Sequence, residues 1–107
     1  MSLLISALAS GSNGNCYYVG NESDAVLIDV GISCRELEKR MHTVGLDMQK
    51  VKAIFISHEH SDHIFGLAAL CKKYSLPVYI TEETLRFSRL KLKYTATHCF
   101  KKMAAVT

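Results

Sequence analysis

Apolar residues in the first part of the chain come in short runs, separated by residues that favour turns. Runs of five or six residues, rich in aliphatic or aromatic side chains, lie at residues 3–8, 16–20, 25–29 and 52–57. Such runs are typical of β-strands. The second and third runs are separated by Asn-Glu-Ser-Asp, which favours a turn and predicts that these two strands pair as a hairpin. A further strand is expected at 78–80.

Helical patterns follow at three places. Ser33 precedes Glu36 by three residues, which is the spacing of an N-terminal capping box, and Gly45 supplies a C-terminal stop. Between them an apolar stripe recurs at i, i+4 and i+7, formed by Leu37, Met41 and Val44. A second helix is expected at about 64–74. A third is expected to begin at Thr81, because two acidic residues follow it.

The alternation of strands and helices indicates an α/β fold with a mostly parallel sheet after an antiparallel start. Two glycine-containing places have two interpretations each. Residues 9–15 form either a plain hairpin connection or a backbone nest for an anion, and their composition favours the connection. Gly66 either permits a close approach of the backbone to the sheet or to a site, or is a simple packing glycine.

Composition limits the class of protein. The 107 residues suffice for one domain, and 49% hydrophobic residues with a mean hydropathy of +0.10 predict a folded core. No apolar run reaches about 18 residues, so neither a membrane span nor a membrane partner is expected. Residues 1–9 resemble a signal peptide but lack its basic segment, and we interpret them as the first strand. The scattered cysteines predict reduced thiols in the cytoplasm; they are Cys16, Cys34, Cys71 and Cys99.

The densest cluster of reactive side chains follows the strand at 52–57. Residues 58–63, His-Glu-His-Ser-Asp-His, hold three of the five histidines and one of the four aspartates. His58 and His60 face the same side of an extended segment, whereas Asp62 and His63 need a turn before they can converge on a neighbouring ion. These donors suit Zn²⁺, Mn²⁺ or Fe. The alternative is a solvated loop whose histidines cap the next helix, but the spacing favours a metal site.

A pair of ions about 3.5–4 Å apart can ionise a water and stabilise both the attacking and the leaving oxygen. Asp29 ends the strand at 25–29, where three roles are open to it. Its carboxylate can accept backbone N–H bonds or orient an imidazole beside a metal, or it can simply form the turn at the strand end. The residue type alone does not separate these roles.

Charge is unevenly distributed along the chain. Residues 1–71 hold five Lys/Arg against eight Asp/Glu, and residues 72–107 hold eight against two. The basic part suggests a polyanionic partner, with Arg86 and Arg89 as candidate contacts to nucleic acid. An ordinary amphipathic segment with a solvated face explains the same pattern, and charge runs are more often of that kind.

The residues described above resemble the metallo-β-lactamase-fold hydrolases. H-x-H-x-D-H after a buried strand is the most specific short motif of that superfamily, and residues 58–63 match it at every defined position. Residues 9–16, 27–33 and 57–64 resemble the bacterial YycJ/WalJ-like branch. The resemblance implies an αββα sandwich and metal-dependent hydrolysis of phosphodiester bonds, most simply by a DNA exonuclease with two divalent ions.

The resemblance also implies a role for each matching residue. His58 and His60 match ligands of the first ion, and Asp62 and His63 match ligands of the second. Asp62 matches the residue that also orients the attacking water, which makes it the candidate catalytic residue. Asp29 matches an aspartate that supports the metal loop without coordinating.

The family's domain is longer than this chain, and its remaining ligands come from the additional part. We therefore expect residues 1–107 to form a single partial domain, truncated at the C-terminus: the N-terminal half of the sandwich, a mixed sheet with helices on one side. Such a half exposes a sheet face and a strand edge, which predicts self-association.

Two other functions remain open. A thioester or lactone hydrolase of the same superfamily would use the same motif on an acyl carbon. A non-catalytic chain that binds metal or a partner would explain why only four ligands can be identified.

Overall fold

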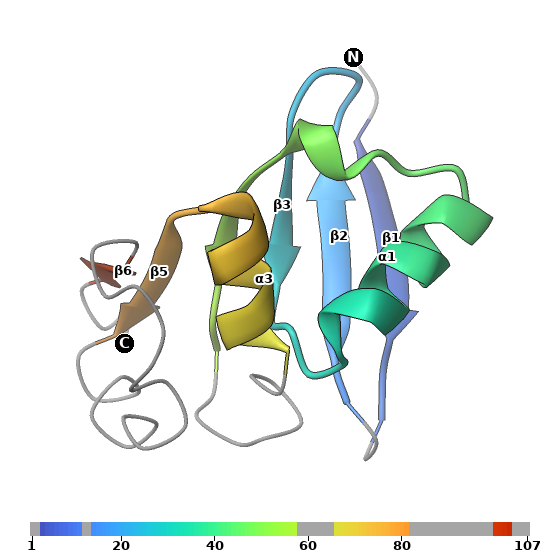
Figure 1. Cartoon of the computed structure of the whole chain (residues 1–107). Helices are drawn as coiled ribbons and strands as arrows, with labels where there is room; N and C mark the ends of the chain where they lie inside the picture. The colour runs from blue at the N-terminus through green and yellow to red at the C-terminus, as the bar shows by residue number, and fades with distance from the viewer. Residues whose placement is uncertain (1–2, 12–13, 58–65, 82–99, 104–107) are drawn as a thin grey trace.

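The computed structural model describes residues 3–11, 14–57, 66–81 and 100–103, which form a mixed sheet with helices (Figure 1). Within these residues the strands follow the sheet order β1-β2-β3-β4-β5-β6. The elements are β1 (Leu4–Ala9), β2 (Cys16–Gly20), β3 (Ala25–Ile28), α1 (Cys34–Thr43), the short 3₁₀ helix η1 (Met48–Lys50), β4 (Val51–Phe55), α3 (Leu67–Tyr74), β5 (Val78–Thr81) and β6 (Phe100–Met103).

The pairing of the strands confirms the expected mixed α/β fold. β1, β2 and β3 pair antiparallel, and β3, β4, β5 and β6 pair parallel. The hairpin between β2 and β3 closes at Asn21, whose side-chain oxygen accepts the N–H groups of Ser23 and Asp24 at 2.8 and 2.9 Å. β6 was not predicted. Its sequence, Phe-Lys-Lys-Met, lacks a strand's alternating pattern, and its parallel pairing with β5 places it in the sheet.

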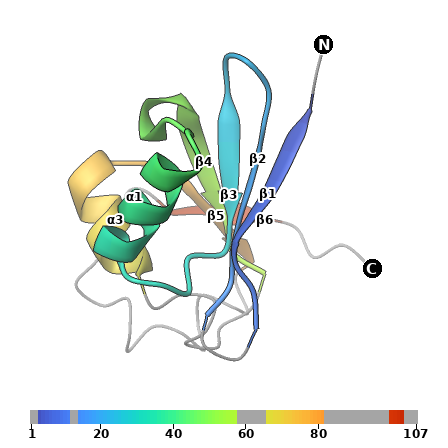
Figure 2. The same cartoon turned by 90° about the vertical axis from the view of Figure 1, so that its right-hand side faces the viewer.

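One face of the sheet carries the core. α1 and α3 both lie on this side (Figure 2). Strand register brings one side chain from each of β2 to β5 into a single row under the helices, formed by Tyr18, Leu27, Ile54 and Val78. Leu37 of α1 and Leu70 of α3 are fully buried above the sheet. Burial of each such aliphatic side chain contributes about 1.5–3 kcal/mol, so this layer accounts for much of the stability.

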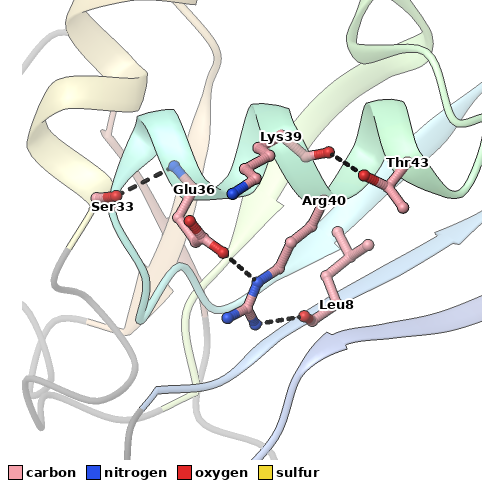
Figure 3. Close-up of polar contacts among 6 residues, drawn as sticks. All are labelled: Leu8, Ser33, Glu36, Lys39, Arg40 and Thr43. Atoms are coloured by element: carbon pink, nitrogen blue, oxygen red, sulfur yellow. Dashed lines mark hydrogen bonds and ion pairs between the residues drawn. The ribbon is translucent and has the colours of Figure 1, made fainter.

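The ends of α1 form largely as the sequence predicts. Ser33 Oγ accepts the N–H of Glu36 at 3.1 Å, which confirms the N-cap, and Gly45 adopts a φ of +77° after the helix. The reciprocal half of the capping box does not form, because Glu36 Oε1 accepts from Arg40 Nε at 2.9 Å (Figure 3). The prediction for Val44 was wrong: Val44 is 55% exposed, since it follows the last turn of the helix.

Arg40 connects α1 to the edge of the sheet. Its Nη1 donates to the carbonyl oxygen of Leu8 at 2.8 Å (Figure 3). The β1–β2 register shifts between Ala7 and Ala9, so Leu8 lies at a bulge. Because a bulge interrupts the ladder of strand hydrogen bonds, the guanidinium supplies a partner for this carbonyl and fixes the helix against β1.

The other predicted elements and cysteines lie only partly within the described residues. β4 ends at Phe55, two residues before the expected end, and α3 is described from Leu67 onward. The helix expected after Thr81 lies outside the described residues. Cys16, Cys34 and Cys71 are buried thiols outside any disulfide, as predicted, and Cys99 lies outside the described residues. In the described part of the chain, no helix is both long and apolar enough to cross a bilayer.

Candidate metal centre

The candidate site lies where β3 and β4 end side by side. These two strands are parallel, and Ile28 pairs with Phe55 at their carboxyl ends. Asp29 follows the first strand and Ser57 the second. The connections after β1 and after β3 lie at the same end of the sheet (Figure 1). Open α/β sheets place their chemistry at this end of the strands, and the predicted ligand segment follows Ser57 in the sequence.

Asp29 holds the residue that precedes His58. Asp29 is 2% exposed, and its two carboxylate oxygens accept the N–H of Ser57 at 2.7 Å and the Ser57 hydroxyl at 2.6 Å. Its own N–H donates to the carbonyl of Phe55 at 2.8 Å. The backbone of Asp29 adopts a φ of +64°, a left-handed conformation that aspartate tolerates better than most residues. Of the roles open to Asp29, the structure therefore shows the acceptance of a backbone N–H.

The Gly-Ser-Asn-rich connection between β1 and β2 packs against the turn that follows Asp29. Gly31 N–H donates to the carbonyl of Asn15 at 2.7 Å. A Cβ on Gly14 would lie 2.6 Å from the carbonyl oxygen of Gly31, and Gly14 has a φ of +132°. Only glycine satisfies both constraints. β1 and β2 pair antiparallel, which confirms the hairpin connection; the described residues of the connection support the turn after β3.

The predicted ligands themselves are not placed. His58, His60, Asp62 and His63 lie outside the described residues, as do Arg86 and Arg89. Within residues 3–11, 14–57, 66–81 and 100–103, no three His, Cys, Asp or Glu side chains lie close enough to hold a metal ion. The described structure therefore contains the two anchors of the segment, Ser57 and Gly66, and the ligand assignments stay predictions.

Sequence reasoning missed the partner of Asp29. Ser57 was assigned to a strand and to the stretch 57–64 but was given no role at the site. A hydroxyl at the end of a buried strand next to the motif is the signal that points to it. The pair is separated by 28 residues in sequence, so no local spacing predicts the contact. It arises because the parallel register of β3 and β4 places their ends together.

Cys16 lies in the same buried region. Burial, reinforced by the negative charge of Asp29 and opposed by the positive charge of Arg40, raises the pKa of the Cys16 thiol to about 12. The thiolate is the reactive form of cysteine. This cysteine is therefore an inert core residue.

We expect Cys16 to resist alkylation in the folded chain at pH 8 and to react after denaturation, as measured by mass mapping of the labelled peptides. The thiol ionises more readily in the unfolded chain, with a pKa near 9.0. Its contribution to stability is therefore complete below pH 9 and is lost as the pH rises toward 12. Rapid labelling of Cys16 under native conditions would contradict this account.

Comparison with known proteins identifies the class. Residues 9–102 match the model of the metallo-beta-lactamase superfamily, and the chain belongs to this superfamily. Membership implies divalent metal ions. The structure of the BLEG-1 B3 metallo-beta-lactamase superposes with a TM-score of 0.65 at 26% identity, over 78% of this chain and 40% of that one.

The similarity in sequence points to one branch. The exodeoxyribonuclease YycJ of Bacillus anthracis is 46% identical over 84 residues, which cover 78% of this chain and 32% of that protein. The exodeoxyribonuclease WalJ of Streptococcus pneumoniae serotype 2 is 38% identical over 79 residues, which cover 74% and 29%. The chain thus spans about a third of the length of these curated relatives. The predicted resemblance to the YycJ/WalJ-like branch is confirmed.

Proposed function

We propose that this chain is the N-terminal part of a metal-dependent nuclease that hydrolyses phosphodiester bonds, with DNA as substrate and exonucleolytic cleavage. The observation that carries the proposal is the contact of Asp29 with Ser57, the residue directly before the H-x-H-x-D-H motif. Membership of the superfamily and the similarity to YycJ and WalJ support the class of reaction.

The donor set fits two divalent ions, Zn²⁺ or Mn²⁺ before Fe. His58 and His60 would hold one ion with neutral imidazole nitrogens, and Asp62 and His63 would hold the second with mixed oxygen and nitrogen donors. Bound ions would supply electrostatic stabilisation for the departing oxygen of the phosphodiester.

The protein's own residues would position the reaction. Asp62 would orient the attacking water. Asp29 binds no metal in this scheme; its carboxylate is already occupied by the N–H and hydroxyl of Ser57, and it would set the direction in which His58 leaves the sheet. Arg86 and Arg89 would contact the phosphate backbone of the nucleic acid.

We expect metal-free protein, purified without a histidine tag, to take up Zn²⁺ or Mn²⁺ at one to two ions per chain. Elemental analysis after desalting measures the stoichiometry. The double variant His58→Ala, His60→Ala should lose at least one ion, whereas His42→Ala is the matched control because His42 is exposed on α1. Failure of the unchanged chain to bind either metal would contradict the proposed metal site.

The substrate class is tested separately, because the motif also fits a thioester or lactone hydrolase. Hydroxyacylglutathione hydrolase of Wigglesworthia glossinidia brevipalpis is 27% identical over 89 residues, a more distant relative than YycJ. Single-stranded DNA and a model thioester are incubated side by side with the metal-loaded chain and with Asp62→Asn. Turnover of the thioester alone would overturn the nuclease proposal; metal binding without turnover of either would favour a metal-binding fragment.

We also propose that the chain self-associates through the side of the sheet opposite α1 and α3. No described helix lies on this side, which we call the open face (Figure 2). Within β1 to β5, strand register assigns to it the side chains of Ile5, Ala7, Tyr17, Val19, Val26, Ile28, Ala53, Phe55 and Tyr79. None of the nine is charged, and the rings of Phe55 and Tyr79 stack with their centroids 4.9 Å apart. Ile5 and Ala7 are exposed, Ala53 is buried and the other six are half-buried. Exposed apolar side chains next to one another favour burial against a second copy.

The proposed location is the reducing cytoplasm. Three cysteines in the described residues are buried thiols outside any disulfide, and secreted proteins of this size commonly rely on disulfides.

A further inference from the structure

We infer that Gly66 is a positioning residue for the predicted metal loop. The turn Asp29-Val30-Gly31 accepts one backbone hydrogen bond from each of the two residues that flank the segment 58–65, and we call these two bonds the holds. Only glycine at position 66 allows the second. The inference rests on the proposed metal site for its functional meaning. The first hold is the bond from Ser57 to the Asp29 carboxylate. The second is the bond from the Gly66 N–H to the Val30 carbonyl, at 2.9 Å.

Glycine is required at position 66 because there is no room for a side chain there. A Cβ built on it would lie 1.9 Å from the carbonyl oxygen of Ile32 and 3.0 Å from the carbonyl carbon of that residue. Gly66 has a φ of −95°, which any residue adopts, so the backbone conformation does not demand glycine. Gly11 and Gly45 show the opposite case: both have positive φ, and a Cβ on either would meet nothing within 4 Å. Of the two interpretations of Gly66, the structure therefore supports the close approach.

The turn that makes both holds is itself fixed. Val30 is fully buried. The Asp29 N–H donates to Phe55 at 2.8 Å and the Gly31 N–H donates to Asn15 at 2.7 Å, so the turn is tied both to β4 and to the connection after β1. Ile32, whose carbonyl a side chain at position 66 would meet, directly follows this turn, so moving Ile32 away would strain those bonds.

The helix on the other side of Gly66 is equally constrained. Leu67 and Leu70 of α3 are fully buried in the core. The carbonyl of Gly66, the N-cap residue of α3, also accepts the N–H of Leu70 at 3.1 Å. Any relief of the contact with Ile32 must therefore displace the start of α3 as a unit, away from Val30.

The size of that displacement decides its effect on metal binding. The 1.9 Å contact must open to at least 3.0 Å, so Gly66 must move by more than 1 Å relative to Ile32. Metal–ligand distances in proteins vary by only about 0.2 Å around their ideal values. Since Gly66 directly follows residues 58–65, a shift of this size at one end should misplace ligands that the Asp29 end still holds.

The test compares Gly66→Ala with Leu70→Ala. Both changes perturb α3, but Leu70 takes part in neither of the two hydrogen bonds that define the holds. Affinity for Zn²⁺ is measured by competition with a chromophoric chelator, at a temperature where both variants are folded by circular dichroism. The Co²⁺ absorption spectrum reports the coordination geometry.

We expect Gly66→Ala to weaken Zn²⁺ binding by about 10-fold or more, the usual effect of a lost supporting contact, and to change the Co²⁺ spectrum. Leu70→Ala should lower the melting temperature at least as much and leave both metal readouts near those of the unchanged chain. Unaltered metal affinity in folded Gly66→Ala would overturn the inference, as would an equal loss in the two variants.

Amide hydrogen exchange of the unchanged, metal-free chain tests the two holds without relying on metal or on the variant. The N–H groups of Ser57 and Gly66 should both exchange slowly, because each donates to a buried acceptor. Fast exchange at Gly66 would overturn the inference even if Gly66→Ala fails to fold. Slow exchange at both N–H groups in a chain that binds no metal would confirm the two hydrogen bonds of the turn. It would refute the proposed metal site instead.

Discussion

Replacing Asp29 by alanine is expected to lower the free energy of unfolding by about 3–5 kcal/mol, a large share of the total for a domain of this size. The change removes the buried acceptor of two bonds from Ser57, at 2.7 and 2.6 Å, and takes this partner away from an N–H and a hydroxyl at a part-buried place. Alanine also tolerates the φ of +64° poorly, which adds about 1–2 kcal/mol.

Chemical denaturation monitored by circular dichroism measures this effect. Asp29→Asn is expected to lower the free energy of unfolding less than Asp29→Ala does, because asparagine tolerates the left-handed conformation and keeps one carbonyl acceptor. Asp24→Ala is the matched control: Asp24 is an exposed turn residue, and its loss should change stability by no more than about 0.5 kcal/mol. If Asp29→Ala and Asp24→Ala had the same free energy of unfolding, the bonds from Ser57 to Asp29 would contribute nothing measurable to stability.

Replacing Ile5 by lysine is expected to weaken self-association at least about 100-fold. Ile5 lies on the open face of edge strand β1 and is 65% exposed in the single chain. A symmetric contact between two copies buries it twice, and burial of an isoleucine contributes about 1.5–3 kcal/mol on each side. Lysine removes this gain and adds like charges across the contact, while leaving the stability of the single chain almost unchanged.

Sedimentation velocity over a range of concentrations distinguishes the outcomes. Val44→Lys is the matched control, because Val44 is 55% exposed but follows α1 on the opposite side of the sheet. We expect Ile5→Lys to shift the chain toward monomer and Val44→Lys to behave like the unchanged chain. A monomer at all concentrations before any substitution would contradict the proposed self-association, and equal effects of the two lysines would exclude the open face.

The local elements were largely predictable from the sequence. Ser33 as an N-cap, Gly45 after the same helix and the hairpin closed by Asn21 each depend on residues within four positions of one another. Such short-range chemistry acts in the same way whatever the rest of the chain does. Where the prediction failed, the local signal was weak or tertiary context decided: Phe100–Met103 forms a strand because it pairs with β5.

The candidate site divides in the same way. The sequence by itself determined the H-x-H-x-D-H motif, the kind of ion that its donors suit and the superfamily to which the chain belongs. Only the tertiary structure decided that Asp29 bonds Ser57 and that Gly66 bonds Val30. These partners lie far apart in sequence. Asp29 and Ser57 meet because β3 and β4 run parallel and end together, and Gly66 meets Val30 because α3 packs on the same sheet. Register and packing are set by the whole core, which no short stretch of sequence encodes.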